Sequence, residues 1–193
     1  MQTMEEIIVF FENLLQSHNT AWLIGQVLGI VAIILGFVSF QMKTQKGLLF
    51  MQVCVAAVFC VHYFLIEAYS GMAMNSVCIV RNLVYDHQNQ KAAKNKLIPL
   101  IFVVIQCVMC ALTWDAWYSV FVLVGIAINT YCMSFSDPQN VRKSIFFSCP
   151  LVLIYNIFAS SIGGIIYESV AIASAFIGVI KNRKKVEASD KET

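Results

Sequence analysis

The chain of 193 residues is too hydrophobic for a globular domain in water. Apolar residues make up 59% of it, charged residues make up 12%, and the net charge is only +2. Soluble domains carry about 25% charged residues, so this chain has too little charge to cover a globule of its size. The composition excludes an ordinary soluble protein and indicates that lipid is the surrounding solvent.

The first twenty residues predict an amphipathic helix. They lack the basic start and the small-residue cleavage site of a secretory signal peptide. Acidic residues and Asn13 lie opposite a hydrophobic set at helical spacing, which consists of Met4, Ile7, Ile8, Phe11, Leu14 and Leu15. We expect residues 1–20 to lie as a helix in the interface at the external face of the membrane.

Seven apolar segments follow, and most are close to the roughly 20 residues that cross a hydrocarbon core as a helix. In chain order, we expect helices at Trp22–Phe40, Leu48–Ile66, Gly71–Tyr85, Leu97–Trp114, Trp117–Phe135, Ile145–Ser161 and Ile165–Ile180. The third and sixth are short for a full crossing. The hydrophobic runs are continuous, without the alternation of an outer-membrane barrel. The predicted fold class is therefore an all-α membrane protein with seven transmembrane helices.

Polar segments separate the predicted helices. We expect Ser136–Ser144 to form a loop and Ile162–Gly164 to form a tight turn. The charged tail after Ile180 has the composition of a disordered segment.

The basic residues predict how the chain is oriented in the membrane. Twelve of the thirteen lie in the loops after spans one, three and five or in the C-terminal tail: Lys43, Lys46, Lys91, Lys94, Lys96, Arg142, Lys143, Lys181, Arg183, Lys184, Lys185 and Lys191. The other loops and the N-terminal segment hold none. Because basic loops stay in the cytoplasm, we expect an odd number of spans, with the N-terminus outside and the C-terminus inside.

The two halves of the apolar region repeat each other. A shift of 95 residues superposes Trp22 on Trp117 and Ser39-Phe40 on Ser134-Phe135, and a shift of 93 superposes Gly71 on Gly164 and Ser76-Val77 on Ser169-Val170. We therefore divide the chain into a first three-helix repeat (21–86), a linker with the fourth span (87–116), a second repeat (117–181) and a tail (182–193). Because the linker crosses the membrane, the repeats are parallel, as in transporters whose solute site lies between the halves.

This 3+1+3 order resembles the SWEET and PQ-loop (MtN3-like) fold of small-solute transporters. Several stretches resemble the bacterial inner-membrane family labelled YgjV more closely: Gly25-Gln26 through Ser39-Phe40, Val61–Leu65, Arg81, Asn156 and Ser161–Gly164. The resemblance runs from Trp22 to Arg183. It implies a SWEET-like fold and an inner-membrane location, and it brings no settled substrate. PQ-loop members carry a Pro-Gln hinge near the end of the first helix of each repeat. Here Pro138-Gln139 follows the fifth span, and the first repeat has Gln41 without a proline.

Polar side chains in the predicted spans are the candidates for a solute pathway, because polar groups are costly inside a bilayer. They are His62, Asn75, Arg81, Asn82, Tyr155, Asn156 and Glu168. At a shift of 93 residues, His62 corresponds to Tyr155 and Asn75 to Glu168. Pro138-Gln139 and Gly163-Gly164 are the candidate hinges.

Structural roles fit several of these residues equally well. His62 and the asparagines suit hydrogen bonds between helices, Tyr155 suits packing, and Arg81 suits a side chain that reaches to the interface. A lone carboxylate at Glu168 needs a partner, a proton or water. These alternatives stay open on the sequence.

Our leading interpretation is a carrier of a small polar solute, in which two three-helix units rock around a central site. The alternative is a seven-helix sensor or signalling protein without transport activity. A retinal protein is disfavoured, because every lysine lies in a loop or tail. No enzyme motif of metal-ligand or nucleophile type is present, and we expect no cofactor and no nucleic acid. The expected partners are the lipid bilayer and the solute; a homo-oligomer is left open.

Overall fold

The structure, a computed structural model, describes residues 19–42, 44–89, 97–134 and 138–189. These residues form seven helices and no strand, as the sequence predicted: α2 (Thr20–Gln41), α3 (Gln45–Leu65), α4 (Tyr69–Asn89), α5 (Ile98–Leu112), α6 (Ser119–Met133), α7 (Pro138–Phe158) and α8 (Ile162–Ser189). The interfacial helix predicted for residues 1–20 lies outside the described residues, apart from its last two positions.

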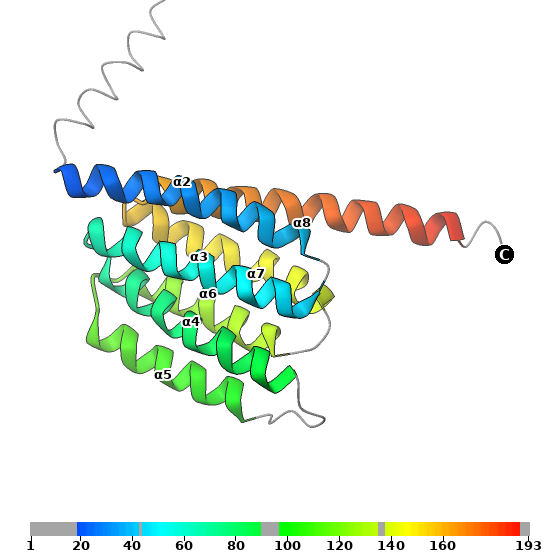
Figure 1. Ribbon diagram of the computed structural model, residues 1–193, viewed down its shortest axis with the longest axis horizontal. Helices are drawn as coiled ribbons and strands as arrows, with labels where there is room; N and C mark the ends of the chain where they lie inside the picture. The colour runs from blue at the N-terminus through cyan, green and yellow to red at the C-terminus, as the bar shows by residue number, and fades with distance from the viewer. Residues whose placement is uncertain (1–18, 43, 90–96, 135–137, 190–193) are drawn as a thin grey trace, which may run out of the picture.

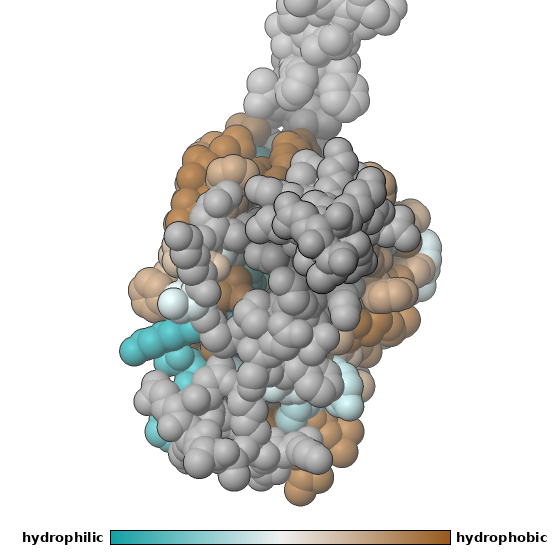
Figure 2. All heavy atoms as spheres, turned by 90° about the vertical axis from the view of Figure 1, so that its right-hand side faces the viewer, coloured by the Kyte–Doolittle hydropathy of each residue, from teal (hydrophilic) through white to brown (hydrophobic). Residues whose placement is uncertain are grey.

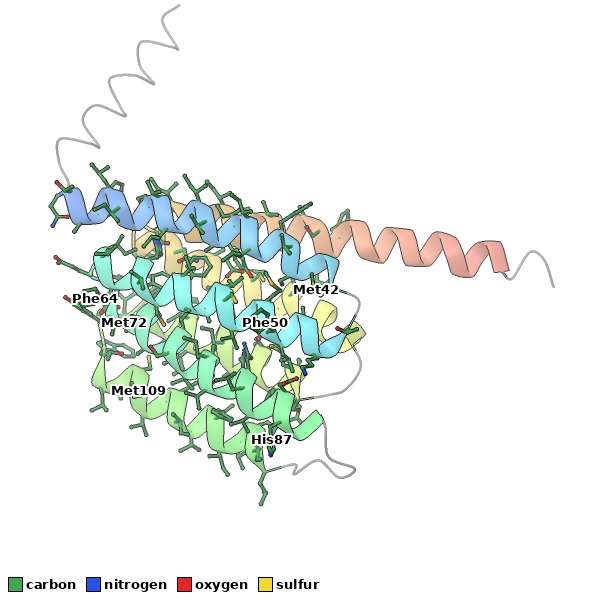
Figure 3. All side chains as sticks on the ribbon, in the orientation of Figure 1. Met42, Phe50, Phe64, Met72, His87 and Met109 are labelled. Carbon is green, nitrogen blue, oxygen red and sulfur yellow. The ribbon has the colours of Figure 1, made fainter. Side chains whose placement is uncertain are left out.

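The helices run up and down beside one another and define two ends of the bundle (Figure 1). We call one end the short-turn end; it holds the connections at residues 66–68, 113–118 and 159–161. The other is the long-loop end, where α2, α4 and α6 end and α3, α5 and α7 begin. In Figure 3, Phe64 and Met72 mark the short-turn end, and Met42 and His87 mark the long-loop end.

Six of the helices close a ring. Each packs against two neighbours, in the order α2, α3, α4, α6, α7, α8 and back to α2. Helix α5 packs mainly against α4 and α6, on the outside of the ring, and lies at the edge of the bundle in Figure 1. The ring order places α4 opposite α8, because two helices separate them in each direction.

Local sequence signals set several helix starts. The Asn19 side chain caps α2 by accepting the Trp22 N–H at 2.8 Å, and Thr44 caps α3 by accepting the Gly47 N–H at 3.1 Å. Such caps satisfy backbone donors that have no partner in the first helical turn.

Two predicted boundaries at the long-loop end are wrong. Helix α7 begins at Pro138, so most of the loop predicted at Ser136–Ser144 is helical. Proline suits the first position of a helix, because the N–H that it lacks would have no partner there. Helix α8 continues to Ser189, although we expected disorder after Ile180. The lysines, arginine and glutamate of this stretch are good helix formers, so the helix extends through them.

The predicted turn at Ile162–Gly164 is also wrong. Helix α8 begins at Ile162 and includes both glycines, while the chain turns at residues 159–161 with Ser160 at a φ of 53°. The turn after α3 has the same geometry, with Glu67 at a φ of 61°. Glu67 and Ser160 are the two non-glycine residues with positive φ in the described chain, and their numbers differ by 93.

The hydrogen bonds of these two turns also repeat at that spacing. Ala68 N–H donates to the Tyr63 carbonyl at 2.9 Å, and Ser161 N–H donates to the Asn156 carbonyl at 3.0 Å. Glu67 N–H donates to Phe64, and Ser160 N–H to Ile157. Both turns are therefore Schellman motifs, which end a helix with one left-handed residue.

The bundle is apolar outside and buries polar side chains among apolar ones inside. Every helix exposes large hydrophobic side chains, as Ile24 does on α2 and Leu100 on α5, whereas buried side chains include His62, Arg81 and Asn82. Figure 2, seen from the long-loop end, shows hydrophobic residues at the upper left and along the right, with a hydrophilic group at the lower left. Such a surface needs lipid rather than water around it.

Two helices are long and apolar enough to cross a membrane by length and composition alone, over Thr20–Ser39 and Lys46–Leu65. Shorter apolar stretches occur at Ile98–Leu112, Ser119–Met133, Ser144–Phe158 and Ile162–Ser174. Seven crossings therefore remain a prediction.

Candidate solute-binding cavity

A cavity of about 160 Å³ lies inside the ring of helices. All six ring helices contribute to its wall, and no residue of α5 does. It extends from Tyr63 and Tyr167, near the short-turn end, to Met42 and Leu48 at the long-loop end. Its polar wall residues, besides the two tyrosines, are Ser39, Gln52, Asn75, Arg81, Asn82, Asn129, Ser148 and Glu168.

Arg81 is a buried cation with neutral partners. Its side chain is 2% exposed. The guanidinium donates to Asn82 Oδ1 from Nε at 3.0 Å and from Nη2 at 2.9 Å, and to Thr130 Oγ1 from Nη1 at 2.7 Å. Nη2 also approaches Met133 Sδ at 3.3 Å. No carboxylate pairs with it in the described part of the chain.

Asn82 is held so that its amide nitrogen stays unpaired. The two bonds from Arg81 fix Oδ1 on the guanidinium. Nδ2 then points away from Arg81; it is buried and has no hydrogen-bond partner. An unpaired buried donor costs about 1–3 kcal/mol, and this one belongs to a residue of the cavity wall.

The linker helix supports Arg81 from outside the ring. Gln106 of α5 is fully buried and donates from Nε2 to Thr130 Oγ1 at 2.8 Å. Tyr85 donates to the Thr130 carbonyl at 3.0 Å. Thr130 therefore joins α4, α5 and α6 at the position of the guanidinium.

Glu168 faces the same cavity from the opposite side of the ring. It is 9% exposed, and Cys149 lies beside it in the cavity wall. No cation pairs with it among the described residues. Among the described residues, Arg81 and Glu168 are the charged residues of the cavity wall, and neither forms an ion pair with another described residue.

His62 lies outside the cavity wall, in a hydrogen-bonded layer at the short-turn end. Nδ1 lies 2.6 Å from the Gly25 carbonyl oxygen, and Nε2 lies 2.7 Å from Ser161 Oγ. Because a carbonyl can only accept, Nδ1 carries the proton. Ser161 Oγ in turn accepts the Gly164 N–H at 3.1 Å. His62 thus joins α2, α3 and the start of α8.

Tyr63 and Asn156 bond directly to each other within this layer. The tyrosine hydroxyl donates to Asn156 Oδ1 at 2.7 Å, and the two residue numbers differ by 93. Each residue also accepts the long hydrogen bond of its own Schellman turn. The pair thus joins equivalent positions of α3 and α7.

Tyr155 completes the layer. Its hydroxyl accepts the Gly71 N–H at 2.8 Å and donates to Asp115 Oδ2 at 3.3 Å. Asp115 also accepts the Ser70 N–H at 2.9 Å. We use the term closing layer for His62, Tyr63, Tyr155, Asn156 and Ser161.

The glycines at the start of α8 allow this layer to pack closely. A Cβ on Gly163 would lie 2.4 Å from the Gly29 Cα, so α2 and α8 meet backbone to backbone. A Cβ on Gly164 would lie 2.3 Å from Asn156 Oδ1. These glycines thus serve close packing, and the turn residue is Ser160.

A second hollow of about 340 Å³ lies beyond the closing layer. Its wall includes Trp22, Glu67, Tyr118, Phe158 and Ser160, all at the short-turn end. On α7, Val152 borders the inner cavity and Phe158 borders the outer hollow, with Tyr155 and Asn156 between them. The closing layer therefore separates two hollows.

The structure divides the residues that the sequence proposed for a solute pathway. Asn75, Arg81, Asn82 and Glu168 line one cavity. His62, Tyr155 and Asn156 belong to the closing layer instead. Of the proposed hinges, Pro138 and Gln139 begin α7 and Gly163 and Gly164 lie in the first turn of α8.

Sequence reasoning missed several polar residues at the site: Gln52, Tyr63, Gln106, Asn129 and Thr130. Gln52 and Asn129 line the cavity, and Gln106 and Thr130 position Arg81. The rule that polar groups in a span are functional candidates would have found the four that are not aromatic. Their partners could not be read from the chain.

Within the described residues, no group of three or more His, Cys, Asp or Glu side chains could hold a metal ion.

Searches of curated proteins and of solved structures found no match. The model of the family Imp-YgjV, described as bacterial inner membrane protein, matches residues 23–186. The apolar surface is consistent with this match, and the chain belongs to the Imp-YgjV family of bacterial inner membrane proteins.

Proposed function

We propose that the protein carries a small polar solute across the bacterial inner membrane. Two three-helix units, α2–α4 and α6–α8, would rock about the cavity between them, and α5 would link them. The observation that carries this proposal is the cavity itself, whose wall holds a buried guanidinium and a buried carboxylate without charged partners. Buried charges without partners are costly and mark solute or ion pathways in membrane proteins.

The ring order supports the two-unit arrangement. Exchanging α2 with α6, α3 with α7 and α4 with α8 converts each helix contact of the ring into another contact that exists. The α2–α8 contact, for instance, becomes the α6–α4 contact. The matching Schellman turns and the Tyr63–Asn156 bond fit the same exchange. A two-fold relation that leaves helix directions unchanged is expected of parallel repeats.

The basic residues suggest which end of the cavity faces the cytoplasm. The long-loop end holds the basic connections, so the positive-inside rule assigns it to the cytoplasm. The cavity reaches that end, while the closing layer lies toward the outside. The structure would then represent an inward-facing state. A reporter fused within 86–96 should be cytoplasmic, and one fused at 115–116 should be external; an external signal at Lys94 would contradict this topology.

The resemblance to the SWEET and PQ-loop fold gives the rocking mechanism its precedent. One departure concerns the hinge, because Pro138 begins α7 rather than interrupting a helix. We propose that the second unit bends where α7 begins, at Pro138-Gln139.

Uptake into proteoliposomes tests the proposal. The purified protein is reconstituted and offered labelled sugars, carboxylic acids, amino acids and vitamins, with and without a pH gradient. We propose that Glu168 carries the coupling proton. Glu168→Gln keeps shape and hydrogen bonding but cannot ionise, so accumulation driven by the pH gradient should be lost while solute exchange continues. Ser169→Ala, at the exposed neighbouring position, is the matched control.

Two results would contradict these assignments. Glu168→Gln and Glu168→Leu variants that both accumulate solute like the parent would remove Glu168 from the pathway. Absence of uptake for every solute class, in protein that is folded and correctly inserted, would favour the sensor or signalling alternative.

A further inference from the structure

The Arg81 side of the cavity has the chemistry of an anion site. Its guanidinium is buried, lines the cavity and is hydrogen-bonded only to neutral groups. One of its five N–H groups has no partner in these contacts, since Nε uses one, Nη1 one and Nη2 two. A negatively charged group beside a buried cation of this kind would stabilise it most.

Asn82 provides a second, independent observation. Its unpaired Nδ2 belongs to the same wall and carries two N–H donors. Because Arg81 holds Asn82 Oδ1, the amide cannot turn its acceptor toward the cavity without losing two bonds. Arg81 and Asn82 therefore place donors of a guanidinium and of an amide next to each other in the wall, and the Asn82 acceptor is occupied.

The charge of the whole cavity limits which anion can bind. Arg81 is the one cation of the wall, and Glu168 lies across the ring. Asn75 is the repeat counterpart of Glu168 and should lie at a similar depth in the bundle. Arg81 lies six residues further along α4 than Asn75, which separates it from that depth by about 9 Å of helix. A dianion such as phosphate or succinate would place its second charge where the described wall residues supply no second cation. A single carboxylate satisfies the donors without that cost.

We propose that Arg81 and Asn82 bind the carboxylate of the transported solute, which is a small monocarboxylic acid with or without an amino group. One carboxylate oxygen would accept the remaining guanidinium N–H and the other an N–H of Asn82 Nδ2, and an amino group would lie toward Glu168. This inference rests on the proposed carrier function, because it assigns the solute class of the same cavity.

Binding can be measured without transport. The full chain in detergent is heated while its tryptophan fluorescence is followed, in the presence of acetate, lactate, alanine, succinate, inorganic phosphate or glucose at about 10 mM and constant ionic strength. We expect at least one of acetate, lactate and alanine to raise Tm by about 3 °C. Succinate, phosphate and glucose should shift it by less than about 1 °C.

Asn82→Asp is the decisive variant. It keeps the size of the side chain, so the fold is retained, but it places a carboxylate on Arg81 and removes the free amide donor. The Tm shift by the monocarboxylate should disappear, and Arg81→Lys should keep only part of it. Ser76→Ala, on the exposed side of α4, should keep all of it.

The outcomes separate this inference from the carrier function. No shift with any of the three monocarboxylates, or an unchanged shift in Asn82→Asp, overturns the carboxylate site. Uptake of glucose that does not depend on Arg81 would also overturn it and leave the carrier function standing. A shift that Asn82→Asp abolishes, in a protein that transports none of the probes, would support the site and contradict the carrier function.

Discussion

The closing layer and the cavity are both polar and both buried, but their hydrogen bonds are satisfied to different degrees. In the layer, both ring nitrogens of His62 have partners, and the Tyr155 hydroxyl both donates and accepts; Asn156 Nδ2 is the exception. In the cavity, Arg81 has no counter-ion and Asn82 Nδ2 has no partner. Satisfied polar groups hold helices together, whereas unsatisfied ones cost stability and retain capacity for a ligand. The comparison favours a structural role for the layer and supports the binding role that we propose for the cavity.

The largest loss of stability should follow from crowding the layer. In Gly164→Ala, the new Cβ would lie 2.3 Å from Asn156 Oδ1 and 2.6 Å from Ser161 Oγ, so two members of the layer must move. We expect the free energy of unfolding to fall by about 3 kcal/mol, measured by titration with SDS in mixed micelles. Gly47→Ala is the control, because its nearest neighbour, Thr44 Oγ1, lies at 3.0 Å and would have to shift only slightly. Equal losses in the two variants would show that the layer is not tightly packed.

Removing the His62 side chain should lower the free energy of unfolding by less than crowding the closing layer does. His62→Leu removes both hydrogen bonds of the imidazole and leaves the Ser161 hydroxyl without its acceptor. The expected loss is about 2 kcal/mol in the same titration. The solute concentration for half-maximal uptake should be unchanged in the protein that stays folded. A change in affinity larger than the change in stability would place His62 in the binding site.

Breaking the bond between the two units should have a smaller effect. Tyr63→Phe removes the hydroxyl that donates to Asn156 and keeps the ring. We expect a loss of about 1 kcal/mol. Because the layer would open more readily, leak of solute out of preloaded proteoliposomes should rise. Leak at the level of the parent would show that other members of the layer are sufficient to close this end.

The cavity variant should change stability least and uptake most. Arg81→Gln gives up hydrogen bonds to Asn82 and Thr130 but also removes a buried charge without a counter-ion, and these effects oppose each other. The unfolding free energy should stay within about 0.5 kcal/mol of the parent, while uptake falls at least about tenfold; Arg81→Lys should restore part of the uptake. Loss of stability with normal uptake would return Arg81 to a structural role.

The helices could be predicted because the length of each hydrophobic segment and the positions of glycines and charged residues depend on the local chain and on the solvent around it. The exceptions lie where local signals conflict. Pro138 suggested a loop but suits the first position of α7, and Gly163 suggested a turn but serves the contact with Gly29 of α2. That contact joins residues 134 positions apart, so no local pattern reveals it.

Local signals also predicted a part of the candidate site. Arg81, Asn82, Asn75 and Glu168 could be selected because polar side chains in a span are costly. Whether a polar side chain faces the cavity or a neighbouring helix depends on its rotation about the helix axis and on distant partners. His62 hydrogen-bonds to Ser161, and Tyr63 hydrogen-bonds to Asn156. These pairs are distant in the sequence, so they could not be predicted from it.

The bond between Tyr63 and Asn156 has a consequence for how such a protein can evolve. A dimer of two identical three-helix chains would place the same residue on both sides of its two-fold axis, so a tyrosine would have to face a tyrosine. A hydroxyl that donates and an amide oxygen that accepts form an unequal pair, as do Asn75 and Glu168 at their matching positions. Joining both halves in one gene lets each position mutate alone. One half of the binding site can then acquire a carboxylate while the other half keeps a neutral amide.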